Sequence, residues 1–262
     1  VDAAGLAGTL KQAGPYTVLA PTNAAFASLL SELGVTKAQL LADKPLLTTV
    51  LTYHVLPGTV RKADIPLGKA VTPLQGSIFK VDAVGSALRI TDGRNRTSNI
   101  TATDIHAANG VVHVVDKVIL PANKNIVQTA QSLTDFSILV EAVVAADLQG
   151  TLSGTGPFTV FAPTNAAFAA LLGELGISKA ALLADKALLT KVLTYHVVSG
   201  RVLKANVPVG TPITTVQGDT FTVNASLAIA DQRSRSANIV ATDVLTSNGV
   251  IHVIDKVILP KS

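Results

Sequence analysis

Residues 17–26 read Thr-Val-Leu-Ala-Pro-Thr-Asn-Ala-Ala-Phe, and their hydrophobic pattern changes period halfway through. The first four residues alternate β-branched and apolar side chains, which predicts a short buried strand. Pro21 ends that strand. Thr22 or Asn23 can cap a helix, because either side chain can accept a hydrogen bond from a free amide of the first turn. Apolar positions then recur at helical spacing from Phe26 onward, so the segment predicts a strand, a sharp corner and a helix.

Two more helices are predicted directly downstream. We expect the first helix to end near Gly34, because glycine adopts the left-handed conformation that closes many helices. Thr36 caps a short second helix, and Lys44 with Pro45 opens a third, where proline suits the first turn. The third helix carries an apolar stripe that consists of Leu46, Leu47, Val50, Leu51 and His54.

After Pro57 and Gly58 the period becomes two, which is typical of strands. Strands are predicted over residues 78–83, 88–91, 99–105 and 111–120. The polar residues 92–96 form a tip between two of them, and Asn109 with Gly110 is the signal of a two-residue hairpin. Helices that precede strands, rather than alternate with them, favour an α+β fold.

The whole pattern occurs twice. Tyr53 and His54 return as Tyr195 and His196, 142 positions later, whereas Asn109 returns 139 positions later. Three residues are therefore missing from the second copy, and we place the loss near residues 84–86, at a hairpin tip where length changes are tolerated. Each copy is long enough to fold as a domain. We predict one domain over residues 1–121 and another over residues 122–262.

The two copies differ at their openings. The second begins with two short segments with apolar faces, 125–130 and 136–142, that predict helices, and Val1 aligns only with Val143. The first copy thus has no counterpart of these segments. We expect the apolar surface that they cover in the second copy to lie open in the first.

Composition narrows the possible classes of protein. The chain has 262 residues, 48% of them hydrophobic but only 4% aromatic, no cysteine and a net charge of +4. Disulfides and thiolate sites are excluded, and a modest, dispersed charge with few aromatics argues against nucleic-acid binding. The most apolar run, 111–120, is too short and too charged to span a bilayer. Because the chain lacks an initial Met and a signal peptide, we expect a mature or trimmed product from which any export signal has been removed.

Three motifs occur in the same order in both copies. They are the 17–26 box repeated at 159–168, the Tyr-His pair, and the closing runs 109–121 and 248–260. Together they resemble the fasciclin (FAS1) domain. The resemblance implies two tandem α+β domains, each a β-sandwich or wedge of about seven strands with packed short helices. It also implies a secreted or cell-surface adhesion or extracellular-matrix protein, not an enzyme. Association of the family's Tyr-His region with integrin recognition makes Tyr53, His54, Tyr195 and His196 candidate partner-binding residues.

The sequence contains no motif that indicates a catalytic site or a metal site. The chain has no Gly-x-Ser-x-Gly elbow, and its three Glu residues fall on polar helical stretches. His54 and His113 could approach each other, but two imidazoles make a poor metal site. We expect core histidines bonded to the backbone or to an acid such as Asp116 or Asp255. We predict no cofactor and no metal.

The polar tips are more promising. Alternating arginines at a hairpin end would present guanidinium groups to anionic sugars, phosphates or carboxylates, which makes Arg94, Arg96, Arg233 and Arg235 candidate anion- or glycan-binding residues. Three Asn-x-Ser/Thr sequences also fit the pattern for N-glycosylation, and they begin at Asn95, Asn99 and Asn224.

The functional hypothesis is adhesion to a cell-surface or matrix protein or to a polysaccharide. The alternative is a self-assembling structural subunit, of a filament or matrix, in which a neighbouring chain covers the open groove of the first domain. A third candidate function is carriage of a small apolar ligand.

Overall fold

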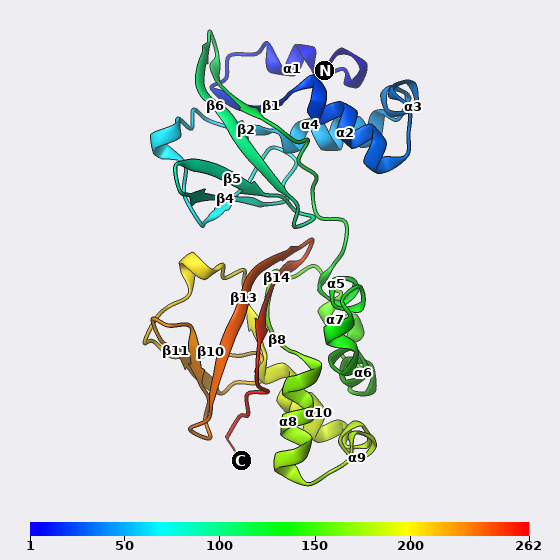
Figure 1. The fold of residues 1–262 in the computed structure, drawn as a ribbon, viewed down its shortest axis with the longest axis vertical. Coiled ribbons are helices and arrows are strands. Elements are labelled where there is room, and N and C mark those ends of the chain that lie inside the picture. Colours follow the sequence, from blue (N-terminus) through cyan, green and yellow to red (C-terminus); the bar gives the residue numbers. More distant parts are fainter. Residues whose placement is uncertain (262) are drawn as a thin grey trace. The chain divides into compact units, whose positions relative to one another are not determined.

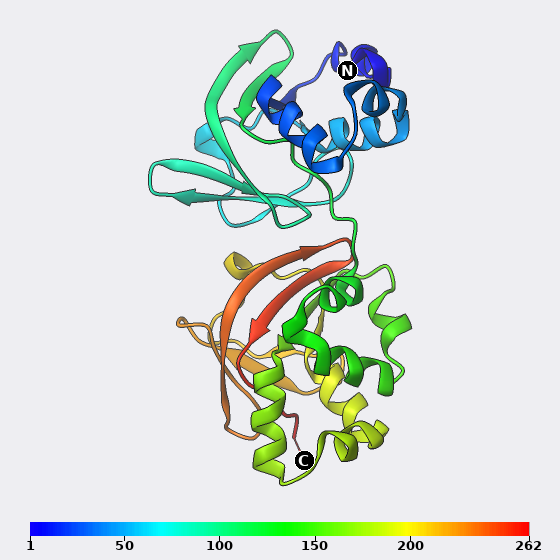
Figure 2. The same cartoon turned by 45° about the vertical axis from the view of Figure 1, so that its right-hand side comes forward.

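A computed structural model describes residues 1–261 of the chain. The chain divides into two compact units, which we call domain 1 (Val1–Asn123) and domain 2 (from Lys124 onward). In each unit the helices gather to one side of the sheet (Figure 1 and Figure 2).

Domain 1 places its α-helices early and most of its strands late, as the pattern predicted. Its helices and 3₁₀ turns are η1 (Asp2–Ala4), α1 (Ala7–Leu10), α2 (Asn23–Leu33), α3 (Lys37–Ala42), α4 (Lys44–Tyr53) and η2 (Lys62–Asp64). Its strands are β1 (Tyr16–Pro21), β2 (Val55–Pro57), β3 (Ala70–Val71), β4 (Phe79–Val84), β5 (Ala87–Thr91), β6 (Thr97–Ala107) and β7 (Gly110–Val115).

Domain 2 repeats this order after a longer helical opening. Its helices and 3₁₀ turns are α5 (Ile126–Gln131), η3 (Thr134–Phe136), α6 (Ser137–Ala145), α7 (Gln149–Leu152), α8 (Asn165–Leu175), α9 (Lys179–Ala184), α10 (Lys186–Tyr195) and η4 (Lys204–Asn206). Its strands are β8 (Phe158–Pro163), β9 (Val197–Ser199), β10 (Ile213–Thr214), β11 (Thr220–Val223), β12 (Ala228–Ala230), β13 (Ser236–Thr246) and β14 (Gly249–Ile254).

Each domain holds one curled sheet of seven strands. In domain 1 the order is β2-β1-β7-β6-β5-β4-β3, and in the described part of domain 2 it is β10-β11-β12-β13-β14-β8-β9. Only β1 with β7 and β8 with β14 pair in parallel among these neighbours. Register shifts within β6 and β13 bend these long strands. The predicted α+β fold of about seven strands with packed short helices is therefore confirmed, with the strands joined in a single sheet.

The corner after β1 forms as its sequence predicts. The Thr22 side chain accepts a hydrogen bond from Ala25 N, so Thr22 rather than Asn23 is the cap of α2. Gly34 closes that helix in the left-handed conformation at φ 65°. Thr36 caps α3 as part of a capping box with Gln39. These short polar contacts satisfy amides that the helix itself leaves free.

The last strand is shorter than predicted. The apolar run continues to residue 120 and predicts a strand over 111–120, but β7 ends at Val115. Beyond that point the buried amides donate to side chains instead of a neighbouring strand: Ile119 N donates to His54 Nε2 and Leu120 N to Asp92 Oδ2. The apolar character of residues 118–120 therefore reflects burial, which a strand and a segment bonded to side chains share.

The three-residue length difference between the copies lies in the β4–β5 hairpin, where the sequence predicted it. The β4–β5 hairpin pairs out to Val84 and Ala87, whereas its counterpart in domain 2 ends its ladder at Val223 and Ile229. At the other end, α1 of domain 1 aligns with α7, and residues 1–123 contain no counterpart of α5 or of the first turns of α6.

Candidate functional site

The two Tyr-His pairs lie at the ends of equivalent helices, α4 and α10. All four side chains are buried, with exposed fractions of 0% for Tyr53, 2% for His54, 0% for Tyr195 and 1% for His196. In this conformation they are core residues. A partner could touch the protein near them but not the side chains themselves, and partner binding in this region stays a prediction.

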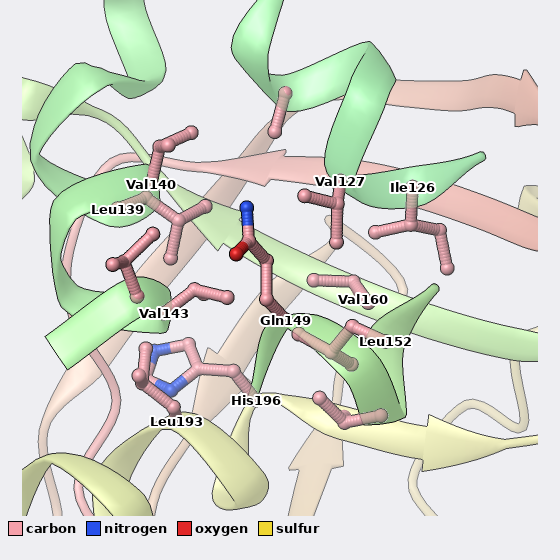
Figure 3. Close-up of a pocket in the computed structure, with 13 residues that line it drawn as sticks. Ile126, Val127, Leu139, Val140, Val143, Gln149, Leu152, Val160, Leu193 and His196 are labelled. Atoms are coloured by element: carbon pink, nitrogen blue, oxygen red, sulfur yellow. The ribbon is translucent and has the colours of Figure 1, made fainter. Parts of the chain in front are cut away.

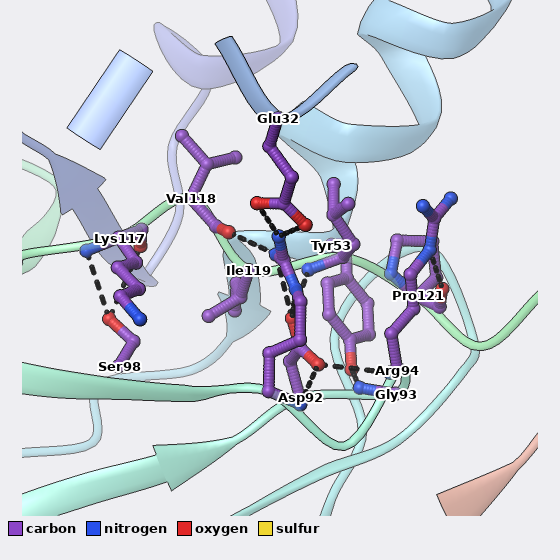
Figure 4. A network of polar contacts seen from close by, with 12 residues as sticks. Glu32, Tyr53, Asp92, Gly93, Arg94, Ser98, Lys117, Val118, Ile119 and Pro121 are labelled. Atoms are coloured by element: carbon purple, nitrogen blue, oxygen red, sulfur yellow. Dashed lines mark hydrogen bonds and ion pairs between the residues drawn. The ribbon is translucent and has the colours of Figure 1, made fainter. Parts of the chain in front are cut away.

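Tyr53 links the helical layer to the sheet. Its hydroxyl donates to Ile78 O at 2.7 Å and accepts from Gly93 N at 2.9 Å. Burial, together with the charge of Asp92, raises the pKa of the phenol far above its usual value. The group is thus a permanent hydrogen-bond donor that fixes the polar tip against the core (Figure 4).

His54 joins α4 to the closing segment. Ile119 N donates to Nε2 at 3.1 Å, so the ring proton is on Nδ1 and is donated to Val50 O at 2.7 Å. Burial lowers the pKa of His54 to about 4. His196 repeats these contacts with Val192 and Ile258, and burial likewise lowers its pKa to about 4.

The other two core histidines also bond to the backbone. His113 Nδ1 accepts from Asp104 N and its Nε2 donates to Val60 O, while His252 is bonded in the same way to Asp243 N and Val202 O. The partner is therefore the main chain and not the acids Asp116 or Asp255. Within residues 1–261, no three His, Cys, Asp or Glu side chains are grouped so that they could hold a metal ion.

Asp92 organises the polar tip of domain 1. Its buried carboxylate accepts from the backbone N of Arg94 and Arg96 through Oδ1. Through Oδ2 it accepts from Nε and Nη2 of Arg96 and from Leu120 N. One carboxylate thereby closes the β5–β6 turn and fastens the closing segment to it (Figure 4).

Arg96 is used inside the domain. Nη1 donates to both carboxylate oxygens of Glu32, at 2.8 and 2.7 Å, and Nη2 donates to Val118 O. In domain 2, Arg235 Nη2 donates to Glu174 at 2.7 Å. The expectation that alternating arginines all turn their guanidinium groups to an outside anion needs correction for this pair, since each is held by an acid on a neighbouring helix.

Arg94 and Arg233 differ from that pair. The Arg94 side chain donates only through Nε, to Pro121 O at 3.4 Å, and Arg233 Nε donates to Pro260 O at 3.1 Å. Among the described residues, nothing accepts a hydrogen bond from their terminal nitrogens. Arg94 is half-buried and Arg233 exposed. These two arginines keep donors available for an anion, and glycan binding at the tips stays a prediction.

A polar groove of about 520 Å³ lies beside the tip of domain 1. Its polar lining comes from α2, the tip and the closing segment, namely Ser28, Glu32, Asn95, Arg96, Thr97 and Lys117. Sequence reasoning missed this groove, because Glu32 looked like part of a solvated helix face and Lys117 like part of a strand. The recurrence of Glu32 and Lys117 as Glu174 and Lys256 was the signal in the sequence that could have pointed to it.

The helical layer of domain 2 encloses an apolar cavity (Figure 3). Its lining includes Val127, Leu139, Val143 and Leu152 from α5–α7, with His196 at the end of α10. The cavity has a volume of about 30 Å³, which is about the size of one or two water molecules. It is a packing defect rather than a site that could hold a small apolar ligand.

Comparison with known proteins identifies a family. The model of the fasciclin domain matches residues 1–121 and again residues 134–260. Human periostin is 30% identical over 261 residues, which cover 98% of this chain and 29% of periostin. Pig transforming growth factor-beta-induced protein ig-h3 is 30% identical over 251 residues, which cover 95% of this chain and 35% of that protein.

A bacterial relative is similar to about half of the chain. Protein sll1483 of Synechocystis is 45% identical over 148 residues, 56% of this chain and 79% of that protein. Among solved structures, a FAS1 domain pair from the insect cell adhesion molecule fasciclin I aligns with a TM-score of 0.49 at 19% identity, and covers 93% of this chain and 88% of that one. The chain spans about a third of the length of the two animal relatives.

Proposed function

The chain belongs to the fasciclin domain family, with one domain in each half, and from that premise we propose that it is a secreted or cell-surface adhesion protein. It would bind a matrix or cell-surface partner, with anionic polysaccharide as the ligand class that its chemistry favours. We assign it no catalytic role and no cofactor. Within residues 1–261, no helix is both long and apolar enough to cross a membrane.

The observation that supports the polysaccharide proposal is that the two arginines of the tip have different contacts. Arg96 is fixed by Glu32 and Asp92, so it holds the tip in one conformation. Arg94 is bonded only through Nε and keeps its planar fork available. A rigid tip with a free guanidinium group loses little entropy on binding a sulfate or carboxylate.

The neighbouring groove adds hydrogen-bonding groups that suit sugars. Asn95 and Thr97 are exposed on either side of Arg96, and Lys117 lines the same groove. Amide, hydroxyl and ammonium groups can bond to sugar hydroxyls and anionic substituents. The chain's charge of +4 favours approach of a polyanion at low ionic strength.

The test is retention of the full chain on immobilised dextran sulfate, with neutral dextran as the reference surface. The double variant Arg94→Gln/Arg233→Gln removes the two available forks and leaves the Asp92 and Glu32 contacts in place. We expect its affinity to fall about tenfold at low salt, since a charge-assisted contact contributes about 1 kcal/mol or more.

The matched control is Lys62→Gln/Lys204→Gln, which removes the same charge from equivalent exposed positions away from the tips. It should retain most of the binding. Equal losses in the two double variants would mean that binding follows net charge alone, and unchanged binding in Arg94→Gln/Arg233→Gln would overturn the tip as the contact site.

A further inference from the structure

The polar groove beside the tip of domain 1 brings charged, hydroxyl and amide side chains together in one concave surface. Its volume of about 520 Å³ lies within the range of about 300–1,000 Å³ that is common for small-molecule sites. Its lining comes from α2, from the β5–β6 turn with the first residue of β6, and from the segment that follows β7. We call this surface the tip groove.

The tip groove joins an apolar floor to a polar rim. Ala25, Leu29 and Val118 belong to its lining and are at most 2% exposed, whereas its polar side chains are half-buried or exposed. Ser28 and Glu32 lie one turn apart, and hence on the same face of α2. A sugar ring suits such a surface, because one face of the ring carries C–H groups while hydroxyl groups surround its edge.

Arg96 is not available to a ligand in this groove. A guanidinium group has five N–H donors, and Arg96 gives two of them to Asp92, two to Glu32 and one to Val118 O (Figure 4). Each carboxylate oxygen of Glu32 accepts one of these bonds and has lone pairs left over. Because the Glu32 side chain is 51% exposed, these lone pairs can accept hydrogen bonds from the hydroxyl groups of a ligand.

Lys117 is the cation that the groove offers to a ligand. Among the described residues only its backbone is hydrogen-bonded, to Ser98 Oγ, and its side chain is exposed. The neighbouring Asp116 carboxylate is bonded to Ser98 and Asn99 instead. Since Arg96 cancels the charge of Glu32, the lining keeps one net positive charge. That balance favours a ligand with one isolated anionic group, because a second anion would lie against Glu32.

We propose that the tip groove binds a uronic acid, that is, a carboxylated sugar residue of a polysaccharide with one carboxylate per sugar. The inference rests on the proposed function and narrows its anionic polysaccharide to a uronate polymer. The carboxylate of the sugar accepts from Lys117 Nζ, and ring hydroxyl groups donate to Glu32. Ser28 and Thr97 bond to further hydroxyl groups, and the C–H face of the ring covers the apolar floor.

Domain 2 keeps the charges of this surface but not all of its hydrogen-bonding groups. Its charged positions carry the same residues, as Glu174, Arg235 and Lys256. Three polar positions differ, since domain 2 has Ala170, Ser234 and Ser236 where domain 1 has Ser28, Asn95 and Thr97. Alanine has no hydroxyl group, and serine has no amide. We therefore expect domain 1 to bind a uronate more tightly than domain 2.

The experiment measures binding of soluble polygalacturonate to the full chain by isothermal titration calorimetry in calcium-free buffer. Polygalacturonate has both a carboxylate and hydroxyl groups on its sugars. Poly-L-glutamate has carboxylates without hydroxyl groups, and neutral dextran has hydroxyl groups without charge. We expect polygalacturonate to bind at least about tenfold more tightly than either reference polymer at equal concentrations of monomer units.

Two pairs of variants locate the contact. Lys117→Gln should weaken binding of polygalacturonate about tenfold, whereas Lys256→Gln makes the same change of charge in domain 2 and should weaken it less than about twofold. Ser28→Ala should weaken binding about threefold. Ser31→Ala, at a serine of α2 outside the groove lining, should leave it unchanged. All four side chains are exposed, so the variants should fold, which thermal unfolding checks.

A gain of binding in domain 2 is the stricter test. The triple variant Ala170→Ser/Ser234→Asn/Ser236→Thr gives domain 2 the polar groups of the tip groove. Asn95 and Ser234 have the same left-handed backbone, at φ 61° and 57°, which asparagine adopts readily. Combined with Lys117→Gln, the triple variant should recover most of the lost affinity. No recovery would contradict the assignment of these groups to sugar binding.

Other results would overturn the inference and leave the proposed function in place. Equal or tighter binding of poly-L-glutamate would mean that the groove responds to charge alone, and would point to an acidic protein segment. Equal losses in Lys117→Gln and Lys256→Gln, or no loss in Ser28→Ala, would remove the tip groove as the contact. The proposed function depends separately on retention by dextran sulfate through Arg94 and Arg233. A chain that binds neither dextran sulfate nor polygalacturonate would overturn both.

Discussion

Leu41 and Leu183 occupy the same place in two domains built from the same motifs, yet their surroundings differ. Leu183 is half-buried beside α6, whereas Leu41 is 40% exposed in an open apolar groove of domain 1. Both belong to short helices with an identical Lys-Ala start and Leu-Leu-Ala end. An amino acid's burial is thus a property of its neighbours, and two copies of one sequence pattern can serve as core in one domain and as an accessible surface in the other.

The polar tips differ in a smaller way. Asp92 accepts hydrogen bonds from the Arg96 guanidinium group, whereas in the described part of domain 2 the hydrogen bond from Arg235 to Asp231 comes from its backbone N. Both aspartates still hold the closing segment, through Leu120 N and Leu259 N. The contact to the backbone is common to both copies, so it is the part of the tip that the fold requires.

The largest expected difference between the domains concerns the phenylalanine under α6. Phe168→Ala removes a fully buried ring and should lower the free energy of unfolding of domain 2 by about 3–5 kcal/mol. Phe26→Ala removes a half-exposed ring and should destabilise domain 1 by only about 1 kcal/mol. Native-state hydrogen exchange read by mass spectrometry resolves the two domains in the intact chain. Equal losses would mean that the apolar groove of domain 1 is closed in solution.

Acid should destabilise both domains in the same pH range. The folded pKa of His54 and of His196 is lowered to about 4, against 6.5 for an unfolded chain. The unfolded state therefore binds protons first, and the free energy of unfolding falls as pH drops from about 6.5 to about 4. The loss approaches about 3 kcal/mol per histidine. Unfolding by denaturant at a series of pH values measures this slope.

A substitution in one domain separates the contribution of His54 to acid destabilisation from that of His196. His54→Gln should lower the free energy of unfolding of domain 1 at neutral pH, because the hydrogen bonds of the imidazole to Val50 O and Ile119 N are lost. It should also reduce the dependence of that free energy on pH between about 4 and 6.5. Domain 2 should keep its slope. His106→Gln, at an exposed position of domain 1, is the control and should leave both slopes in place. A slope in domain 1 that survives His54→Gln would assign the acid sensitivity to other groups.

The fold could be predicted largely from local chemistry. Thr22, Gly34 and Thr36 mark helix ends through contacts within a few residues, so their sequence positions predict their structure. The end of β7 could not be predicted in this way. It depends on the side chains of Asp92 and His54, which accept hydrogen bonds from Leu120 N and Ile119 N, 28 and 65 positions further along the chain. In a longer strand these two amides would bond to a neighbouring strand.

The candidate sites were harder to predict for the same reason. The apolar stripe that contains His54 correctly predicts the face of α4 that packs into the core. Because His54 and Tyr53 are buried there, neither side chain is accessible to a partner. At the tips, a pattern of alternating charges cannot distinguish Arg94 from Arg96. That distinction depends on Glu32, 64 positions away from Arg96. The open apolar groove of domain 1, by contrast, was predictable, because the internal repeat supplies a filled copy for comparison.

The smallest expected effect tests whether the polar contacts of α6 specify its position or stabilise it. The side chains of Lys179 and Glu141 are 45% and 44% exposed, so water screens their attraction. Glu141→Gln should therefore reduce the free energy of unfolding of domain 2 by no more than about 0.5 kcal/mol. Apolar contacts such as that of Phe168 would then supply the affinity of the helix for its surface, while the ion pair selects its register. A loss of 2 kcal/mol or more would reverse that assignment and would make the Lys179–Glu141 ion pair the main contact that stabilises α6 on its surface.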